Sequence, residues 1–149
     1  MTKAERAKDL FLQGYNCAQA TFGAFCEDYG LDFNVAMTLS AGLSGGIGRL
    51  RETRGAVTGA TLAVSLAMGS FEVNNPDAKT RVYEEIRKVV EIFEGETGSI
   101  ICADMLGVAR RGDDANAEPR TPEYYKKRPC ADLVYLAADA ADKIITNLQ

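Results

Sequence analysis

Four cysteines are the residues of this 149-residue chain best suited to chemistry, and most of them share a local position. Cys17 falls in the first turn of an expected helix, Cys102 in the first turn of a short helical segment, and Cys130 directly after a proline at a helix start. The unpaired N–H groups of a helix N-terminus carry roughly half a positive charge, which favours thiolate over thiol. Because no two cysteines form a CxxC, the sequence offers neither a thioredoxin-type dithiol nor a zinc-ribbon knuckle.

The surroundings of the cysteines differ along the chain. Cys130 follows three basic residues, Lys126, Lys127 and Arg128, which add positive potential. Cys26 lies late in its helix among aromatic residues, where a thiolate is disfavoured, and we expect it to be a buried structural residue. The spacing is equally compatible with four free cysteines in an ordinary core, since free cysteine is among the most buried residue types.

The composition restricts the classes of function. The chain has no histidine, which removes the usual general base and the commonest zinc ligand, and this argues against Ser-His and Cys-His hydrolases and His-rich metal enzymes. A net charge of −4 argues against general nucleic-acid binding, which needs clustered Lys and Arg. With 46% hydrophobic residues, 26% charged residues and 4 prolines, the chain is expected to form a single domain over residues 1–149.

The distribution of charged residues along the chain indicates the cellular compartment in which we expect the protein. The N-terminal segment is charged from Lys3 to Asp9 and no uninterrupted apolar core follows it, so we expect no signal peptide. The longest uncharged run, 55–71, is shorter than the about 20 apolar residues of a spanning helix, so we expect no membrane insertion. The cytoplasm is then the expected compartment, where cysteines are free, metal-bound or transiently catalytic.

Apolar periodicity and capping signals predict an all-α fold, with no segment that alternates like a strand. The expected helices span about 2–14, 16–30, 32–43, 55–71 and 75–95, with a short segment at 99–106 and a last helix after Pro129. N-cap residues support several starts, such as Asn16 with Gln19, and Asn75 before Pro76. The polar segment 107–128 is expected to be a long surface loop. We therefore predict a compact bundle of about five to six helices, with this loop before the last one.

The glycines admit two interpretations. Gly45 and Gly46 belong to a run that lacks the GK[ST] of a phosphate loop, so we expect them to end a helix and let backbones approach closely. A nest of backbone N–H groups that binds an anion is the alternative. Gly55 and Gly59, in the uncharged helix, are expected to allow tight helix–helix contact. The candidate ligand-binding residues are Arg54, Gly45, Gly46, Gly55 and Gly59.

Several segments occur together in one order: GYNCAQA at 14–20, GGIGR at 45–49, GAVTGA at 55–60, then Cys102 and Cys130. In this combination the chain resembles the family of proposed redox-active proteins named for its C-GCAxxG-C-C cysteine pattern, over nearly its whole length. The resemblance implies a small protein with four motif cysteines, proposed to be redox-active and often encoded near transporter genes. It implies no particular reaction or substrate.

The resemblance carries the motif cysteines to Cys17, Cys102 and Cys130, but an arginine stands at the remaining position. The family's CGAxxG segment reads RGAVTG at 54–59, which places Arg54 where the family has cysteine. A metal or iron–sulfur site would then have three thiolate ligands instead of four, and a relay of two disulfides would lose one partner. Arg54 is either a solvated turn residue, or a cation that favours a nearby thiolate or pairs with a carboxylate or phosphate of a ligand.

The leading hypothesis is a helix-lined pocket at which Cys17, Cys102 and Cys130 converge. Arg54 and the turn 55–59 would form its wall, with Cys17 beside Arg54 and Cys102 approaching Cys130. The expected activity is thiol–disulfide chemistry, in which a thiolate of low pKa attacks and a second cysteine resolves. Cys102 and Cys130 are the preferred pair, because each has an expected helix start and each matches a motif position.

Two alternatives stay open beside this hypothesis. The same three cysteines could bind a metal or an iron–sulfur cluster, or the chain could be a non-catalytic helical binding module that has lost the full cysteine set. Whether the protein is an enzyme is therefore undecided, and a thiol-based oxidoreductase is the enzyme class that fits. The sequence identifies no cofactor. The expected partners are a small molecule or a redox protein, and the resemblance adds a link to a transporter.

Overall fold

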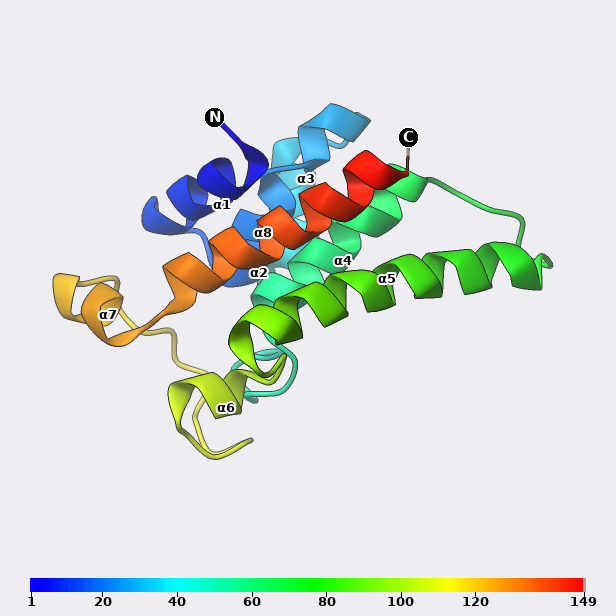
Figure 1. Cartoon of the computed structure of the whole chain (residues 1–149). Helices are drawn as coiled ribbons and strands as arrows, with labels where there is room; N and C mark the ends of the chain where they lie inside the picture. The colour runs from blue at the N-terminus through cyan, green and yellow to red at the C-terminus, as the bar shows by residue number, and fades with distance from the viewer. Residues whose placement is uncertain (149) are drawn as a thin grey trace.

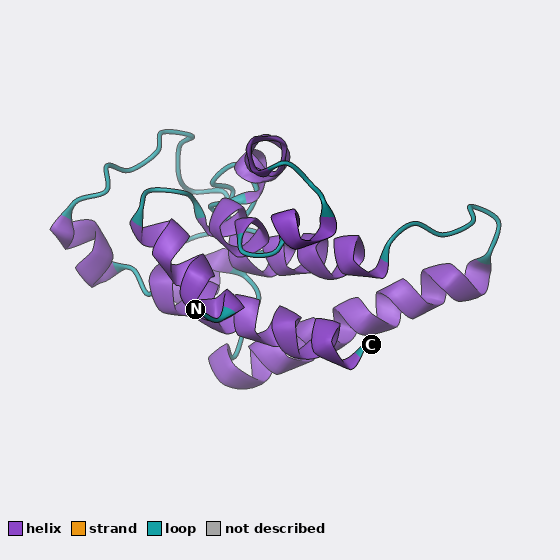
Figure 2. Ribbon diagram, turned by 90° about the horizontal axis from the view of Figure 1, so that it is seen from above, coloured by secondary structure: helices purple, strands orange, loops and turns teal. Residues whose placement is uncertain are grey.

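The computed structural model describes residues 1–148, and over this range the chain folds into helices and loops without a β-strand (Figures 1 and 2). The helices are α1 (Lys3–Leu12), α2 (Cys17–Gly23), α3 (Phe33–Ser40), α4 (Gly55–Met68), α5 (Pro76–Thr97), α6 (Cys102–Leu106), α7 (Pro122–Lys127) and α8 (Cys130–Asn147), with 3-10 turns η1 (Cys26–Tyr29) and η2 (Ala41–Leu43). The predicted all-α class is confirmed.

The helix count exceeds the expected five to six, partly because the segment 107–128 is not a loop throughout. It contains α7, whose N-cap residue Thr121 accepts a hydrogen bond from the Tyr124 amide at 3.2 Å. Pro122 occupies the first helical position, where a backbone N–H has no partner within the helix in any case. Of the two prolines that led us to expect a loop, Pro122 marks the start of a helix.

Capping side chains set where the first two helices begin. Thr2 and Asn16 each accept a hydrogen bond from the backbone N–H of the third helical residue, while Glu5 and Gln19 reach back to the N–H of the cap residue. Such a reciprocal arrangement satisfies two donors that the helix leaves free. The predicted restart of the chain at Asn16 is confirmed, and it makes Cys17 the first residue of α2.

The uncharged helix α4 is the centre of the bundle, as its sequence predicted. It packs against α2, α5 and α8, and α8 also packs along α1 (Figure 1). Several of its fully buried side chains are alanines, at positions 56, 60 and 63. Small side chains on a buried helix let the neighbouring helices approach it closely from several sides.

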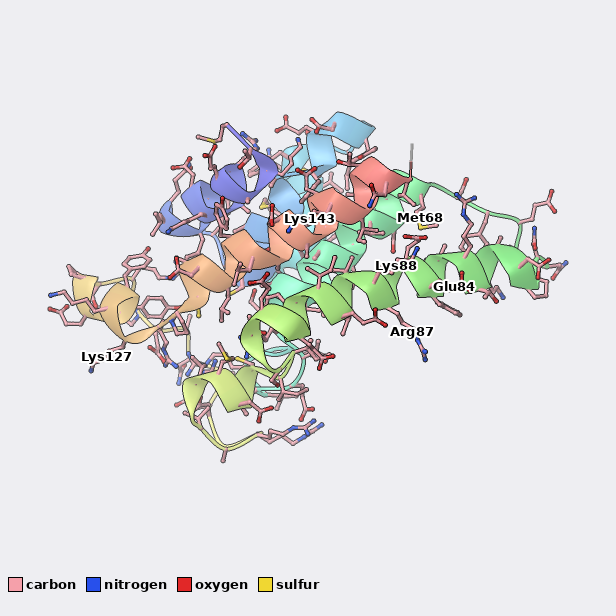
Figure 3. The ribbon with its side chains drawn as sticks, viewed as in Figure 1. Met68, Glu84, Arg87, Lys88, Lys127 and Lys143 are labelled. Atoms are coloured by element: carbon pink, nitrogen blue, oxygen red, sulfur yellow. The ribbon has the colours of Figure 1, made fainter. Side chains whose placement is uncertain are left out.

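Helix α5 is amphipathic, as its periodicity predicted. Val89 and Phe93 are buried against the bundle. The labelled polar side chains Glu84 and Arg87 project from the other side of the helix (Figure 3). Of the helices that residues 1–148 form, none is long and apolar enough to span a lipid bilayer.

The first turn of α2 lies directly against α4 at two glycines. A Cβ at Gly59 would stand 2.7 Å from the Ala18 carbonyl oxygen, and one at Gly55 would stand 2.9 Å from the Ser44 Cα. Ser44 in turn accepts a hydrogen bond from the Ala18 amide at 2.9 Å. The predicted tight contact at Gly55 and Gly59 is confirmed. It brings the start of α2, with Cys17, against the start of α4.

Replacing Gly59 with alanine tests this contact. The new methyl group would press on backbone atoms of α2, which cannot turn aside as a flexible side chain can, so we expect the unfolding free energy to fall by about 1–3 kcal/mol. For a chain of this size that corresponds to roughly 2–4 °C in Tm per kcal/mol, measured by thermal or urea unfolding.

Gly95→Ala in α5 is the matched control, since a Cβ there meets no heavy atom of residues 1–148 within 4 Å. Alanine is the better helix former by about 0.5–1 kcal/mol, so this variant should be neutral or slightly more stable. Equal destabilisation by the two substitutions would contradict the contact.

Candidate functional site

A small cavity lies where α2, α4, α6 and α8 begin. Its volume is about 50 Å³. The residues that line it are Cys17, Gly45, Arg51, Arg54, Gly55, Ala56, Cys102, Met105, Leu106, Cys130 and Leu133. The expected convergence of three cysteines with Arg54 at one pocket is thus confirmed. All four cysteines of the chain are free thiols in the structure.

The cysteines of the cavity share one position in their helices. Cys17, Cys102 and Cys130 are the first residues of α2, α6 and α8, and Arg54 is the N-cap residue of α4. The free N–H groups of a helix start carry partial positive charge, which attracts thiolates and other anions. The predicted placement at helix starts is confirmed for all three cysteines.

Cys130 and Cys17 form a hydrogen-bonded pair across the contact between α2 and α8. The hydrogen bond from Cys17 lowers the pKa of the Cys130 thiol to about 7, although burial opposes the shift, and Arg128, Arg120 and Arg54 lower it further. The same hydrogen bond and burial raise the pKa of Cys17 well above its ordinary value. Cys130 is therefore the thiol of the pair that ionises first, and the hydrogen bond from Cys17 favours its thiolate form.

Cys102 is held in place by the loop before α4. The Cys102 amide donates to the Glu52 carbonyl oxygen at 2.7 Å, so the start of α6 is held by the segment before α4 and not by the bundle. Arg51 Nη1 donates to the Cys102 sulfur at 3.7 Å. The hydrogen bond to Cys130 comes from Cys17, since α2 and α8 pack on each other. Cys102 lines the same cavity as Cys130, and their preference as a reacting pair stays a prediction.

Arg51 is a site residue that sequence reasoning missed. It is 5% exposed, and its Nε donates to Asp113 Oδ2 at 2.7 Å. This pairing lowers the pKa of the Asp113 carboxyl below its ordinary range. Asp113 lies 62 positions away in the long segment before α7, so a local pattern could not indicate the pair.

The loop between η2 and α4 presents Arg51 through an unusual backbone. Ile47, Arg49 and Arg51 adopt left-handed φ angles of 66°, 66° and 62°, a conformation that costs about 1 kcal/mol or more for a residue with a side chain. Gly46 has a φ of 71° and lies close to the backbone of Arg51 and Glu52 in the same loop. A Cβ at Gly46 would stand 2.4 Å from the Glu52 nitrogen. Gly46 thus permits a close approach of backbone, the first of the two interpretations above.

Of the four glycines proposed to bind a ligand, two border the cavity. Gly45 and Gly55 line it. Gly46 faces the backbone of Glu52, and Gly59 faces Ala18 of α2, both outside the cavity lining. Gly46 and Gly59 therefore shape the walls by permitting contact between backbones.

Arg54 is buried, so its interpretation as a solvated turn residue is wrong. The residue is 4% exposed, and its guanidinium carbon lies 5.5 Å from the centre of the Phe93 ring. Burial lowers the pKa of Arg54, while the cysteines around it act in the opposite direction. The side chain lines the cavity together with Cys17, as the sequence predicted.

Arg120 adds a further positive charge near the pair and was also missed by sequence reasoning. Its Nη1 donates to the Phe11 carbonyl oxygen and its Nη2 to the Tyr15 carbonyl oxygen, both at 2.9 Å. Its guanidinium carbon also lies 4.2 Å from the centre of the Phe11 ring. Arg120 thereby ties the segment before α7 to the turn between α1 and α2, next to Cys17.

Cys26 lies apart from the cavity. It is fully buried in the hydrophobic core, and its sulfur donates to the Gly23 carbonyl oxygen at 3.7 Å. Burial raises the pKa of this thiol. The expectation that Cys26 is a buried residue is confirmed.

The three cavity cysteines do not fit a metal site. Throughout residues 1–148, no group of three Cys, His, Asp or Glu side chains is arranged to hold a metal ion. Arg51 and Arg54 also line the cavity, and two buried guanidinium groups repel a metal cation. The donor set, with arginine at the position where the resemblance places a cysteine, therefore disfavours the metal and iron–sulfur alternative.

A family model with the description "Putative redox-active protein (C_GCAxxG_C_C)" matches residues 15–144 of the chain. This range contains the three cavity cysteines and Arg54. Searches of curated proteins and of solved structures found no match to the chain. The resemblance noted from the sequence motifs is confirmed.

Replacing Cys17 with alanine tests the origin of the low pKa at Cys130. The variant loses the hydrogen bond that chiefly stabilises the thiolate, so we expect the pKa of Cys130 to rise from about 7 toward the value near 8.5 of a free cysteine. The thiolate fraction at pH 7, and with it the rate of alkylation by iodoacetamide, should then fall roughly tenfold. The rate at Cys130 is followed against pH by peptide mass spectrometry.

Cys17→Ser is the matched control, since its hydroxyl keeps a hydrogen-bond donor and should raise the pKa of Cys130 less than alanine does. An unchanged pKa in the alanine variant would show that the arginines alone set it.

Proposed function

Since the chain belongs to the C_GCAxxG_C_C family of putative redox-active proteins, we propose that it carries out thiol–disulfide exchange, with Cys130 as the attacking thiolate and Cys17 as the resolving thiol. The observation that carries this proposal is that Cys17 and Cys130 line one cavity at the starts of α2 and α8. There the hydrogen bond from Cys17 lowers the pKa of Cys130 to about 7, and the pKa of Cys17 is raised. An attacking thiol is most effective when its pKa lies near the ambient pH.

In the first step, the Cys130 thiolate attacks one sulfur of a disulfide R–S–S–R. A bond forms between Cys130 and that sulfur, the S–S bond of the substrate breaks, and one RS⁻ leaves. The positive charges of Arg128, Arg120 and Arg54, which lower the pKa of Cys130, also stabilise the negative charge that develops on the departing RS⁻.

In the second step, Cys17 gives its proton to the departing RS⁻ and attacks the Cys130 sulfur. The Cys17–Cys130 disulfide forms and a second RS⁻ leaves, so two protein thiols supply the two electrons that reduce one disulfide. The raised pKa of Cys17 depends chiefly on its hydrogen bond to Cys130 and on burial, and the thiolate charge adds to it. Once Cys130 is in the mixed disulfide, that charge is gone and Cys17 ionises more readily.

Cys102 is the third reacting thiol in this proposal. It lines the same cavity, and its sulfur accepts a hydrogen bond from Arg51 Nη1 at 3.7 Å. Its attack on the Cys130 sulfur of the protein disulfide would form Cys102–Cys130 and return Cys17 to the thiol, which moves the disulfide toward the α6 side of the cavity. An external thiol regenerates the dithiol by the reverse exchange.

The Cys17→Ser variant tests the division of roles, with glutathione disulfide as the probe. Serine cannot resolve the mixed disulfide, so we expect Cys130 to accumulate one bound glutathione, detected by intact-protein and peptide mass spectrometry. Cys130→Ser should react no faster than the uncatalysed control, because the hydroxyl is not ionised at neutral pH.

Cys26→Ala serves as the matched control, since Cys26 lies in the core away from the cavity and its loss should leave the exchange intact. Rapid release of both glutathione thiols by Cys17→Ser would transfer the resolving role to Cys102. Unchanged exchange in Cys130→Ser would refute the proposal and favour a non-catalytic binding module.

A further inference from the structure

The guanidinium of Arg54 is a buried positive charge that the chain itself does not neutralise at contact distance. The residue is 4% exposed, and Nε, Nη1 and Nη2 have no hydrogen-bond acceptor among residues 1–148. Buried polar groups in proteins are nearly always hydrogen-bonded, and an unpaired buried charge is costly. Such a group requires an anionic partner.

The neighbours of Arg54 do not supply this partner. Arg51, on the same cavity wall, has its own carboxylate in Asp113 at 2.7 Å. The Phe93 ring offers an attractive face to the guanidinium but no lone pair to accept its N–H groups. The Asp104 carboxylate and the ionised sulfurs of the cavity attract Arg54 through their charge, but none of them accepts a hydrogen bond from it.

The cavity beside Arg54 suits a small anion. Arg54 and Cys130 both line it, so a group held by the guanidinium lies next to the reactive sulfur. The starts of α4 and α8, helices of 14 and 18 residues, add partial positive charge at the same place. Met105, Leu106 and Leu133 complete an apolar wall, which strengthens the attraction between opposite charges by excluding water.

We propose that this cavity is an anion site, in which a carboxylate or small oxyanion group of the molecule that reacts at Cys130 pairs with Arg54. The parallel N–H groups of a guanidinium match two oxygens of such a group. A volume of about 50 Å³ accommodates the charged end of a molecule and leaves the rest outside. The claim that the anion is part of a substrate rests on the proposed function, whereas the binding of the anion does not.

Two alkylating reagents of nearly equal size test the site directly. Iodoacetate carries a carboxylate and iodoacetamide is its neutral counterpart, and both react with the same thiolate. The ratio of their rates at Cys130 therefore reports charge recognition independently of the thiolate fraction. The reference is the same ratio for Cys130 in the urea-unfolded chain, measured by peptide mass spectrometry.

We expect the iodoacetate-to-iodoacetamide ratio to be at least about tenfold higher in the folded protein than in the Arg54→Gln variant, as for the loss of a charge-assisted hydrogen bond. Arg54→Lys keeps the charge and should retain part of the preference. Arg110→Gln, on the exposed surface, is the matched control and should leave the ratio unchanged. A folded wild-type ratio equal to that of the unfolded chain would overturn the proposal.

Anion protection of the wild-type protein gives a second readout that does not depend on the variants folding. Sodium sulfate and sodium acetate are compared with sodium chloride at matched ionic strength, and the rate of Cys130 alkylation by iodoacetamide is measured. Slower alkylation in sulfate indicates an oxyanion ligand, and slower alkylation in acetate indicates a carboxylate. Equal rates in all three salts would overturn the anion site.

These measurements separate the anion site from the proposed function. Neither alkylating reagent is a disulfide, so charge preference at Cys130 supports the site even if exchange with glutathione disulfide is absent. Conversely, active exchange without charge preference or anion protection would overturn the anion site alone.

Discussion

The backbone contact between α2 and α4 is the constraint on which the cavity depends. With glycine at 55 and 59, no side chain separates α4 from the Ala18 and Ser44 backbone, and the two helix starts meet at a distance that any Cβ would prevent. Cys17 and Arg54 then border one space, and α8, which packs on both helices, brings Cys130 to the same place. The two most specific motif segments, 14–20 and 55–60, are thus the two sides of one contact. Their joint presence in the sequence has a steric reason.

The arginine at position 54 changes what this cavity can do. A cysteine there would add a fourth soft ligand or a second disulfide partner, whereas the guanidinium adds a permanent positive charge that is 4% exposed and beside the other thiols. The charge lowers the pKa of Cys130 together with Arg128 and Arg120. It also works against any metal cation. Under the proposed function, this arginine favours thiolate chemistry and anionic ligands over metal binding.

Features of the fold that depend on neighbouring residues, such as helix starts, could be predicted from the sequence. The caps at Asn16 and Asn75, the uncharged centre of the bundle and the helix-start position of three cysteines are all found in the structure. Contacts between distant segments left no such signal: Arg51 meets Asp113 across 62 positions, and Arg120 meets Phe11 across 109. The hydrogen bond between Cys17 and Cys130 left no local signal for the same reason, since it follows from which helices pack together. For Arg54, the family motif indicated a place on the cavity wall, whereas the local composition, a charged turn, was equally compatible with a solvated side chain.

The backbone at the start of α4 is held independently of the Arg54 side chain. Main-chain hydrogen bonds hold the turn at Arg54, whose amide donates to the Ile100 carbonyl oxygen at 2.8 Å and whose carbonyl accepts from the Thr58 amide at 3.0 Å. The side chain is left to face the cavity. A residue placed in this way can be exchanged without undoing the helix behind it. The chemical character of the cavity at position 54 is therefore decided by the side chain that stands there, while the main chain fixes where that side chain begins.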